Sequence, residues 1–72
     1  MEVEVRLFAT FREGRQKKQK MKISENTTIL DIINILKIDE EEVAIMLLNG
    51  RDGSSDRILK DGDILALFPP VG

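Results

Sequence analysis

The chain opens with a strict alternation of apolar and polar residues. The apolar residues of this segment are Met1, Val3, Val5 and Leu7, and charged residues stand between them. A period of two predicts a strand with one buried face. Phe8 departs from the alternation, because its large apolar side chain falls on the polar side. Two interpretations stay open: a loop covers Phe8, or a partner protein contacts it.

A second alternation runs over residues 17–23 and predicts a second strand. Lys18, Lys20 and Lys22 share one face of this strand, and the other face carries Gln19, Met21 and Ile23. Six of the eleven basic residues lie between Arg12 and Lys22. Lysines commonly protect an exposed edge strand, so we favour a solvated edge. A basic patch for phosphate or for an acidic partner is the alternative.

Isoleucines at helical spacing predict a helix of about ten residues after Thr28, with one face packed on the sheet. Thr28 and Asp31 fit the capping box that starts many helices. Four consecutive acids at 39–42 then predict a short helical turn. We interpret these acids as a solvated turn and not as a metal or general-acid site, because consecutive carboxylates on a turn point in different directions.

Two apolar runs, 43–48 and 64–68, complete the pattern and predict buried central strands. Asn49-Gly50 and Asp61-Gly62-Asp63 are turn signals. The predicted order is ββαββ, with the last strand beside the first. This order predicts an α+β domain of the ubiquitin-like, β-grasp kind over residues 1–68, with a mixed sheet and one main helix packed on one face.

Composition narrows the range of functions. The 72 residues allow one small core and no deep pocket, so we expect a partner to complete any site. The sequence contains no Cys, His, Trp or Tyr, which excludes disulfides, thiolate nucleophiles and histidine chemistry. The net charge is −2, and the three Phe are the only aromatic residues. Because nucleic-acid binding usually needs a basic surface and aromatic rings for stacking, we expect no nucleic-acid partner. The same missing Cys and His lead us to expect no metal site. Because no long apolar run or signal sequence is present, we expect no membrane partner and a cytoplasmic location.

The last four residues predict an extended C-terminal tail, 69–72. Pro69 and Pro70 fix φ and remove two backbone donors, so this segment cannot continue the sheet. Val71 offers a small apolar anchor, and Gly72 has no side chain to obstruct a narrow channel. The pattern therefore predicts a terminal carboxylate presented on a thin, stiff stalk.

Four segments resemble the MoaD/ThiS sulfur-carrier family, in order and at matching spacing. They are VRLFATFRE at 5–13, LNGR at 48–51, LKDGD at 59–63 and ALFPPVG at 66–72. The ending Phe-Pro-Pro-Val is more similar to the small subunit of molybdopterin synthase than to the thiamin carrier. The resemblance implies a carrier that is not an enzyme by itself and that binds no cofactor.

Several partners follow from the resemblance. An E1-like enzyme would use ATP and magnesium to adenylate the terminal glycine, Gly72, and a sulfur donor would convert it to a thiocarboxylate. The tail would then enter a larger molybdopterin synthase subunit, guided by Pro69, Pro70 and Val71, and sulfur would pass to the pterin precursor of a molybdenum or tungsten cofactor. Phe8 and Phe68 match apolar positions at which family members meet their partners, whereas Arg51 and Asp52 are charged where an apolar contact is expected.

Two points stay open at this stage. The family pattern ends in Gly-Gly, and here a single glycine follows Val71. Either the chain is shortened, or it acts with one glycine. The alternative functions are a ubiquitin-like modifier joined to lysines, a sulfur carrier for the thiamin thiazole, and an interaction module with an inert tail.

Overall fold

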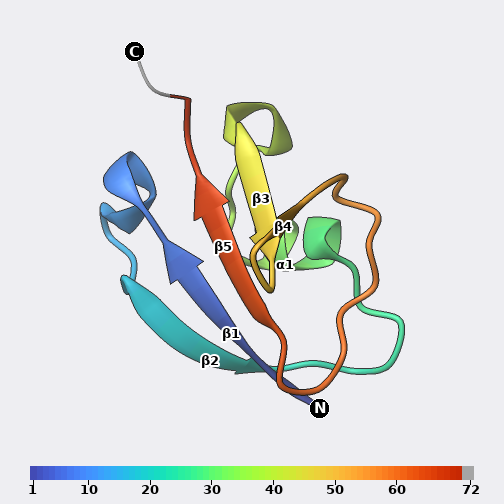
Figure 1. Cartoon of the computed structure of the whole chain (residues 1–72). Coiled ribbons are helices and arrows are strands. Elements are labelled where there is room, and N and C mark those ends of the chain that lie inside the picture. The colour runs from blue at the N-terminus through green and yellow to red at the C-terminus, as the bar shows by residue number, and fades with distance from the viewer. Residues whose placement is uncertain (71–72) are drawn as a thin grey trace.

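A computed structural model describes residues 1–70 of the chain (Figure 1). Its elements, in chain order, are strand β1 (Glu2–Leu7), 3-10 helix η1 (Ala9–Arg12), strand β2 (Lys18–Lys22), helix α1 (Ile29–Ile35), 3-10 helix η2 (Glu40–Glu42), and strands β3 (Ile45–Leu48), β4 (Arg51–Asp52) and β5 (Ile64–Phe68). The strands form one mixed sheet in the order β2-β1-β5-β3-β4. β1 and β5 are parallel neighbours at its centre, and the other pairs are antiparallel. The predicted β-grasp fold, with the last strand beside the first, is confirmed.

α1 packs against one face of the sheet, and the core lies between them (Figure 1). The fully buried side chains of this layer come from β1, α1, β5 and the loop before β5, and they are Val3, Val5, Leu7, Ile29, Ile32, Ile33, Leu59, Leu65 and Leu67. Burying a residue of this size contributes about 1.5–3 kcal/mol, so this layer supplies most of the stability of a small domain. Phe11 is also buried and anchors η1 to the core, which the alternation pattern did not predict.

Local interactions determine where α1 begins and where it ends. The Thr28 hydroxyl accepts from the Asp31 backbone N–H at 3.2 Å, and the Asp31 carboxylate accepts from the Thr28 N–H at 2.9 Å, so the predicted capping box is present. The helix is seven residues long, shorter than the ten expected. It stops because Leu36 forms the C-cap and Lys37 takes a left-handed conformation with φ of 59°.

The two apolar strands are not buried on both faces, contrary to the prediction. In β5 the side chains alternate between half-buried and fully buried, and β3 has no fully buried residue. Ile45, at the start of β3, is 41% exposed. The physical reason is that one helix covers only one face of an antiparallel or mixed sheet, which leaves the apolar residues of the other face open.

Candidate functional site

The tail exit lies at the end of the central strand β5. The last backbone hydrogen bond at this end runs from the Ala44 N–H to the Phe68 carbonyl, at 2.9 Å. Pro69 is half-buried and Pro70 is exposed. Neither proline has an N–H, so sheet pairing ends at Phe68. Figure 1 shows β5 running between η1 and η2 and the chain continuing past the end of the sheet. The predicted residues Val71 and Gly72 lie outside the described residues.

Phe8 and Phe68 form a stacked pair at this exit. Their ring centroids are 4.3 Å apart, and the ring planes differ by 12°. In the parallel register of β1 and β5, Leu7 lies beside Leu67. The next residues along the chain, Phe8 and Phe68, are therefore also neighbours. Both rings are half-buried, and neither of the earlier alternatives for Phe8 describes this contact. Their role as partner-binding residues stays a prediction.

Arg12 lies over the Phe8 ring of this pair. Its guanidinium carbon lies 5.2 Å from the centre of the Phe8 ring, in cation–π geometry. Its Nε donates to the Leu7 carbonyl at 2.8 Å, which holds η1 against the end of β1. Sequence reasoning counted Arg12 only as one of the basic residues and missed this contact, because the contact depends on the turn that η1 makes.

The face of the sheet opposite α1 carries an apolar half, which we call the apolar patch. The register of β3 against β5 places Ile45 beside Phe68 and Leu47 beside Ala66. The apolar patch therefore consists of Phe8, Ile45, Leu47, Ala66 and Phe68. None of these side chains is fully buried, although all are apolar. An apolar surface of this kind beside the tail exit suits the docking of another protein.

The other half of the same face is basic, and we call it the cationic strip. Lys18, Lys20 and Lys22 of β2 lie opposite Arg6, Glu4 and Glu2 of β1, respectively. Lysines on one face of an edge strand were predicted, and the structure confirms this arrangement. The Arg6 guanidinium donates to the Glu4 carboxylate at 2.5 Å. This hydrogen bond lowers the pKa of Glu4, and the charges of Arg6, Lys18 and Lys20 lower it further.

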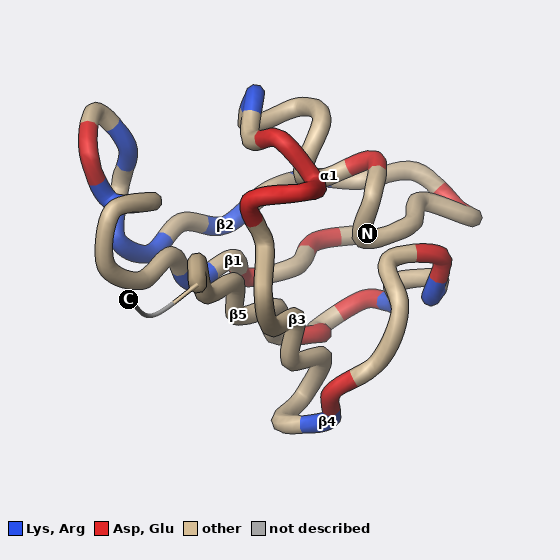
Figure 2. Tube along the Cα trace, turned by 90° about the horizontal axis from the view of Figure 1, so that it is seen from above, with Lys and Arg blue, Asp and Glu red and all other residues tan. Residues whose placement is uncertain are grey.

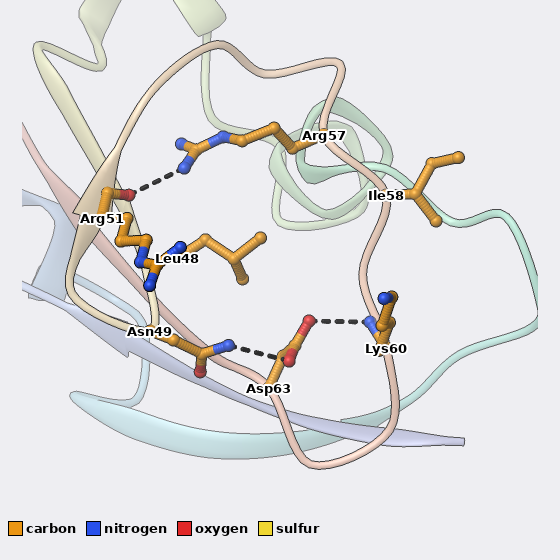
Figure 3. A pocket seen from close by; sticks show the side chains of 7 residues that line it. All are labelled: Leu48, Asn49, Arg51, Arg57, Ile58, Lys60 and Asp63. Atoms are coloured by element: carbon orange, nitrogen blue, oxygen red, sulfur yellow. Dashed lines mark hydrogen bonds between the residues drawn. The ribbon is translucent and has the colours of Figure 1, made fainter.

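A hollow of about 560 Å³ lies at the opposite end of β5 from the tail (Figure 3). Each of the three guanidinium nitrogens of Arg57 donates one hydrogen bond beside it, to the backbone carbonyls of Met46, Arg51 and Ser54 at 2.7–2.8 Å. Asn49 donates from its amide to Asp63 at 2.9 Å. These groups hold the loop between β3 and β5 in place. Arg51 and Asp52, noted above as charged, form the short strand β4, where both are exposed.

The acids at 39–42 serve the turn that was predicted there. The Asp39 carboxylate accepts from the Glu41 N–H at 3.1 Å, and Glu40 accepts from the Ser55 hydroxyl. All four acids are exposed. Within residues 1–70 no group of three or more acidic side chains is arranged to hold a metal ion. In the same part of the chain, no helix is both long and apolar enough to cross a membrane.

Comparison with known proteins gives a consistent result. The ThiS family model matches residues 5–72. Small archaeal modifier protein 3 of Haloferax volcanii is 33% identical over 90 aligned positions, which cover 99% of this chain and 97% of the relative. A solved Pyrococcus furiosus structure, described as a candidate molybdopterin converting factor subunit 1, has 32% identity and a TM-score of 0.79 and covers 99% of each chain.

A third similar structure is a complex of two proteins. It is the protein–protein complex of subunits 1 and 2 of the molybdopterin-converting factor from Helicobacter pylori. The matched chain of that complex is 26% identical, with a TM-score of 0.70, and the match covers 100% of this chain and 97% of that one.

Proposed function

Because the chain belongs to the ThiS family of ubiquitin-like sulfur carriers, we propose that it carries sulfur as a thiocarboxylate on its C-terminal glycine. We assign this sulfur to the synthesis of a molybdenum- or tungsten-pterin cofactor. In this proposal the chain is a carrier and the small subunit of a larger synthase. The nucleotide, the magnesium ion and the pterin bind to its partners.

The observation that carries this proposal is the position of the tail exit. Pro69 and Pro70 follow directly on Phe68, whose ring stacks on Phe8 on the face that α1 does not cover. A partner that binds the apolar patch would thus receive the tail at the edge of the same interface. The apolar patch would supply most of the affinity for the partner. The narrow tail would then be free to enter the partner's active site.

The chemistry of the tail requires activation. A carboxylate is a poor acyl donor, so an E1-like enzyme would let the Gly72 carboxylate attack the α-phosphorus of ATP and release pyrophosphate. A persulfide sulfur would then attack the acyl carbon and displace AMP. A thiol would cleave the acyl disulfide and leave the thiocarboxylate on this chain. None of these steps needs a His or Cys here, and the sequence contains neither.

The neighbours support the molybdopterin assignment and a larger partner. The Helicobacter pylori protein is recorded in complex with subunit 2 of its converting factor, and the Pyrococcus furiosus protein carries a related description. We therefore propose a second, larger synthase subunit as the acceptor of the tail of this chain. The shared fold over nearly the whole length supports this proposal.

A second candidate is supported by the Haloferax volcanii relative, which is described as a small archaeal modifier protein. In that role the same adenylate would be attacked by a lysine amine of a target, and an isopeptide bond would form with loss of AMP. Sulfur transfer for the thiamin thiazole is a third candidate within the carrier class. The three candidates share activation and differ in the group that attacks the activated glycine or receives its sulfur.

Intact mass spectrometry after incubation with an E1-like enzyme, ATP and a persulfide donor tests the proposal. We expect the mass gain of one oxygen-for-sulfur exchange. The Gly72→Val variant should show no gain while its melting temperature is unchanged, and a version extended by Gly-Gly serves as the matched control. A gain confined to the extended chain would assign the reaction to the added glycine. Lysine-linked products would favour the modifier, and no reaction of either form would contradict the proposal.

A further inference from the structure

Basic side chains from three consecutive segments gather around β2. Arg6 belongs to β1, Arg12 and Lys17 to the connection, and Lys18, Lys20 and Lys22 to β2. On the open face Arg6, Lys18, Lys20 and Lys22 accompany two carboxylates, Glu2 and Glu4. The connection adds Arg12, Arg15 and Lys17 against one acid, Glu13, although the whole chain has a net charge of −2. Figure 2 shows Lys and Arg along β2 and in the loop before it, which also contains the acidic Glu13, and shows the acidic stretch of η2 elsewhere. Basic residues therefore outnumber acidic ones on this side of the molecule.

Neutralisation inside this cationic strip is incomplete. The salt bridges among residues 1–70 both end on Glu4, which lies 2.5 Å from Arg6 Nε and 4.0 Å from Lys18 Nζ. Over the same residues, no salt bridge reaches Lys17, Lys20 or Lys22. Lys20 and Lys22 of the strip thus remain available to carboxylates supplied from outside the chain, and Lys18 is engaged only through its 4.0 Å contact with Glu4.

The backbone of β2 adds directional groups to this charge. The Lys17 carbonyl accepts from Leu7, and the Ile23 N–H donates to Met1, so the odd-numbered residues of this strand bond to β1. The N–H and C=O groups of Lys18, Lys20 and Lys22 consequently face away from β1. β2 is the outermost strand on this side, so these groups form a free sheet edge.

A hollow joins the cationic strip to the tail exit. It measures about 250 Å³ and is lined by Arg6, Leu7, Phe8, Arg12, Lys17 and Lys18. The Phe8 ring is shared between this hollow and the stacked pair. A segment bound along β2 would therefore lie within one continuous interface with a protein on the apolar patch.

We propose that the edge of β2 binds an extended acidic segment of a partner protein, which adds a strand and places carboxylates at alternating positions against Lys18, Lys20 and Lys22. This rests on the proposed function, because the partner is the protein that takes the tail. The chain itself shows the required pattern, since Glu2 and Glu4 of β1 lie opposite Lys22 and Lys20 on the inner side of β2. Opposite charges at such cross-strand positions stabilise pairing.

Two other occupants fit less well. A second copy of the chain paired through β2 would bring lysines opposite lysines, which is destabilising. Single-stranded nucleic acid needs free aromatic faces for stacking, whereas here Phe8 and Phe68 stack on each other and Phe11 is buried. Charge complementarity therefore selects an acidic polypeptide.

A peptide titration tests this inference without any partner enzyme. The probe is a blocked octapeptide of alternating Thr and Glu, added to the 15N-labelled chain, and the matched control peptide carries Gln in place of Glu. We expect saturable amide shifts centred on residues 18–22 and slower hydrogen exchange at Lys18, Lys20 and Lys22. The Glu peptide should bind several-fold more weakly at about 200 mM salt than at about 20 mM, because exposed charges are screened.

Variants localise the effect. Lys20→Gln should weaken binding about threefold, the range of one exposed ion pair, and Lys20→Arg should restore it. Lys60→Gln, which makes the same charge change on another part of the surface, should leave binding unchanged, and the amide spectrum of each variant reports its fold. Equal binding of the Gln peptide, shifts centred elsewhere, absence of binding at low salt, or tighter binding of polyuridine at the same residues would each overturn the inference.

This test is independent of the proposed function. Peptide binding requires neither ATP nor an activating enzyme, so it can succeed when no oxygen-for-sulfur exchange occurs. Conversely, a chain that gains sulfur normally but does not bind the Glu peptide would refute the acidic-strand inference and leave the carrier role intact.

Discussion

The Asp61 carboxylate accepts a hydrogen bond from the backbone N–H of Glu2 at 2.8 Å. The contact is reinforced by the Gly62 N–H, which donates to the Glu2 carbonyl at 2.8 Å. Residues 59 positions apart are thereby joined. The turn before β5 is fastened to the start of β1, at the lower end of the central parallel pair, far from the tail exit.

Replacing Asp61 should lower stability without affecting the tail. In Asp61→Ala the N–H of Glu2 loses its acceptor, and we expect a loss of about 1 kcal/mol in the free energy of unfolding, because the bond is exposed and water replaces it in part. Urea unfolding measures this loss. Glu25→Ala removes an exposed acid elsewhere and is the control. Normal stability of Asp61→Ala would show that the Glu2 contact does not hold the turn.

Gly62 should be sensitive to substitution because of its backbone and not because of crowding. Its φ is +85°, and an added Cβ would meet no atom within 4 Å. Gly62→Val should therefore cost about 1–2 kcal/mol through left-handed strain, and Gly62→Asn should cost less because Asn tolerates this region better. Thermal unfolding of both variants gives the comparison. Equal losses would argue against conformational strain as the cause.

Arg57 should be required for the order of the loop between β3 and β5. Arg57→Ala removes three hydrogen bonds to backbone carbonyls, and we expect a loss of about 2–3 kcal/mol. Arg57→Lys keeps the charge but lacks the planar fork, so it should recover only part of the loss. Denaturant unfolding and amide exchange over residues 51–57 measure the effect. Full recovery by Lys would indicate that charge alone matters.

The apolar patch leads to a prediction about partner binding. Phe8→Ala removes one ring of the stacked pair, and we expect the affinity for the larger synthase subunit to fall at least tenfold, as for a central aromatic contact. Calorimetry with the purified subunit measures the change. Ile58→Ala, which truncates a 51% exposed apolar residue outside the patch, is the matched control. An equal effect of both variants would contradict docking on this face.

The Arg6–Glu4 pair predicts a specific pH dependence. The Arg6 hydrogen bond lowers the pKa of Glu4 from its ordinary value of 4.5, so between the two pKa values the unfolded chain binds more protons than the folded chain. The stabilisation is present above pH 4.5 and is lost as pH falls through the lowered pKa of the folded state. In Arg6→Gln the pKa of Glu4 should rise, and the stability difference from the parent chain should shrink in acid.

Carboxyl 13C titration of Glu4 in both proteins, with urea unfolding on each side of pH 4.5, measures these two effects. Lys60→Gln controls for the change in net charge. An unchanged Glu4 titration in Arg6→Gln would rule out the guanidinium as the cause.

Strands β1 and β2, the helix cap and the adjacency of β1 and β5 could be read from sequence because each follows a local period or a burial argument. The contact of Phe8 with Phe68 could not, since it depends on the parallel register that sets Leu7 beside Leu67. The exposure of Ile45 was also missed. A continuous apolar strand predicts burial on both faces. The single helix of this fold covers only one face, so the apolar residues on the other face stay exposed.

The parallel pairing of β1 with β5 has a consequence for biosynthesis. The central pair of the sheet joins the earliest-made strand to the last strand of the described chain, so the core cannot close on a ribosome-bound nascent chain until residues 64–68 have emerged. Incomplete chains lack both their central strand and the phenylalanine beside the exit. A partner that recognises the folded face would therefore bind only chains whose synthesis has passed that point, so folding itself would control which molecules take part in the proposed sulfur transfer.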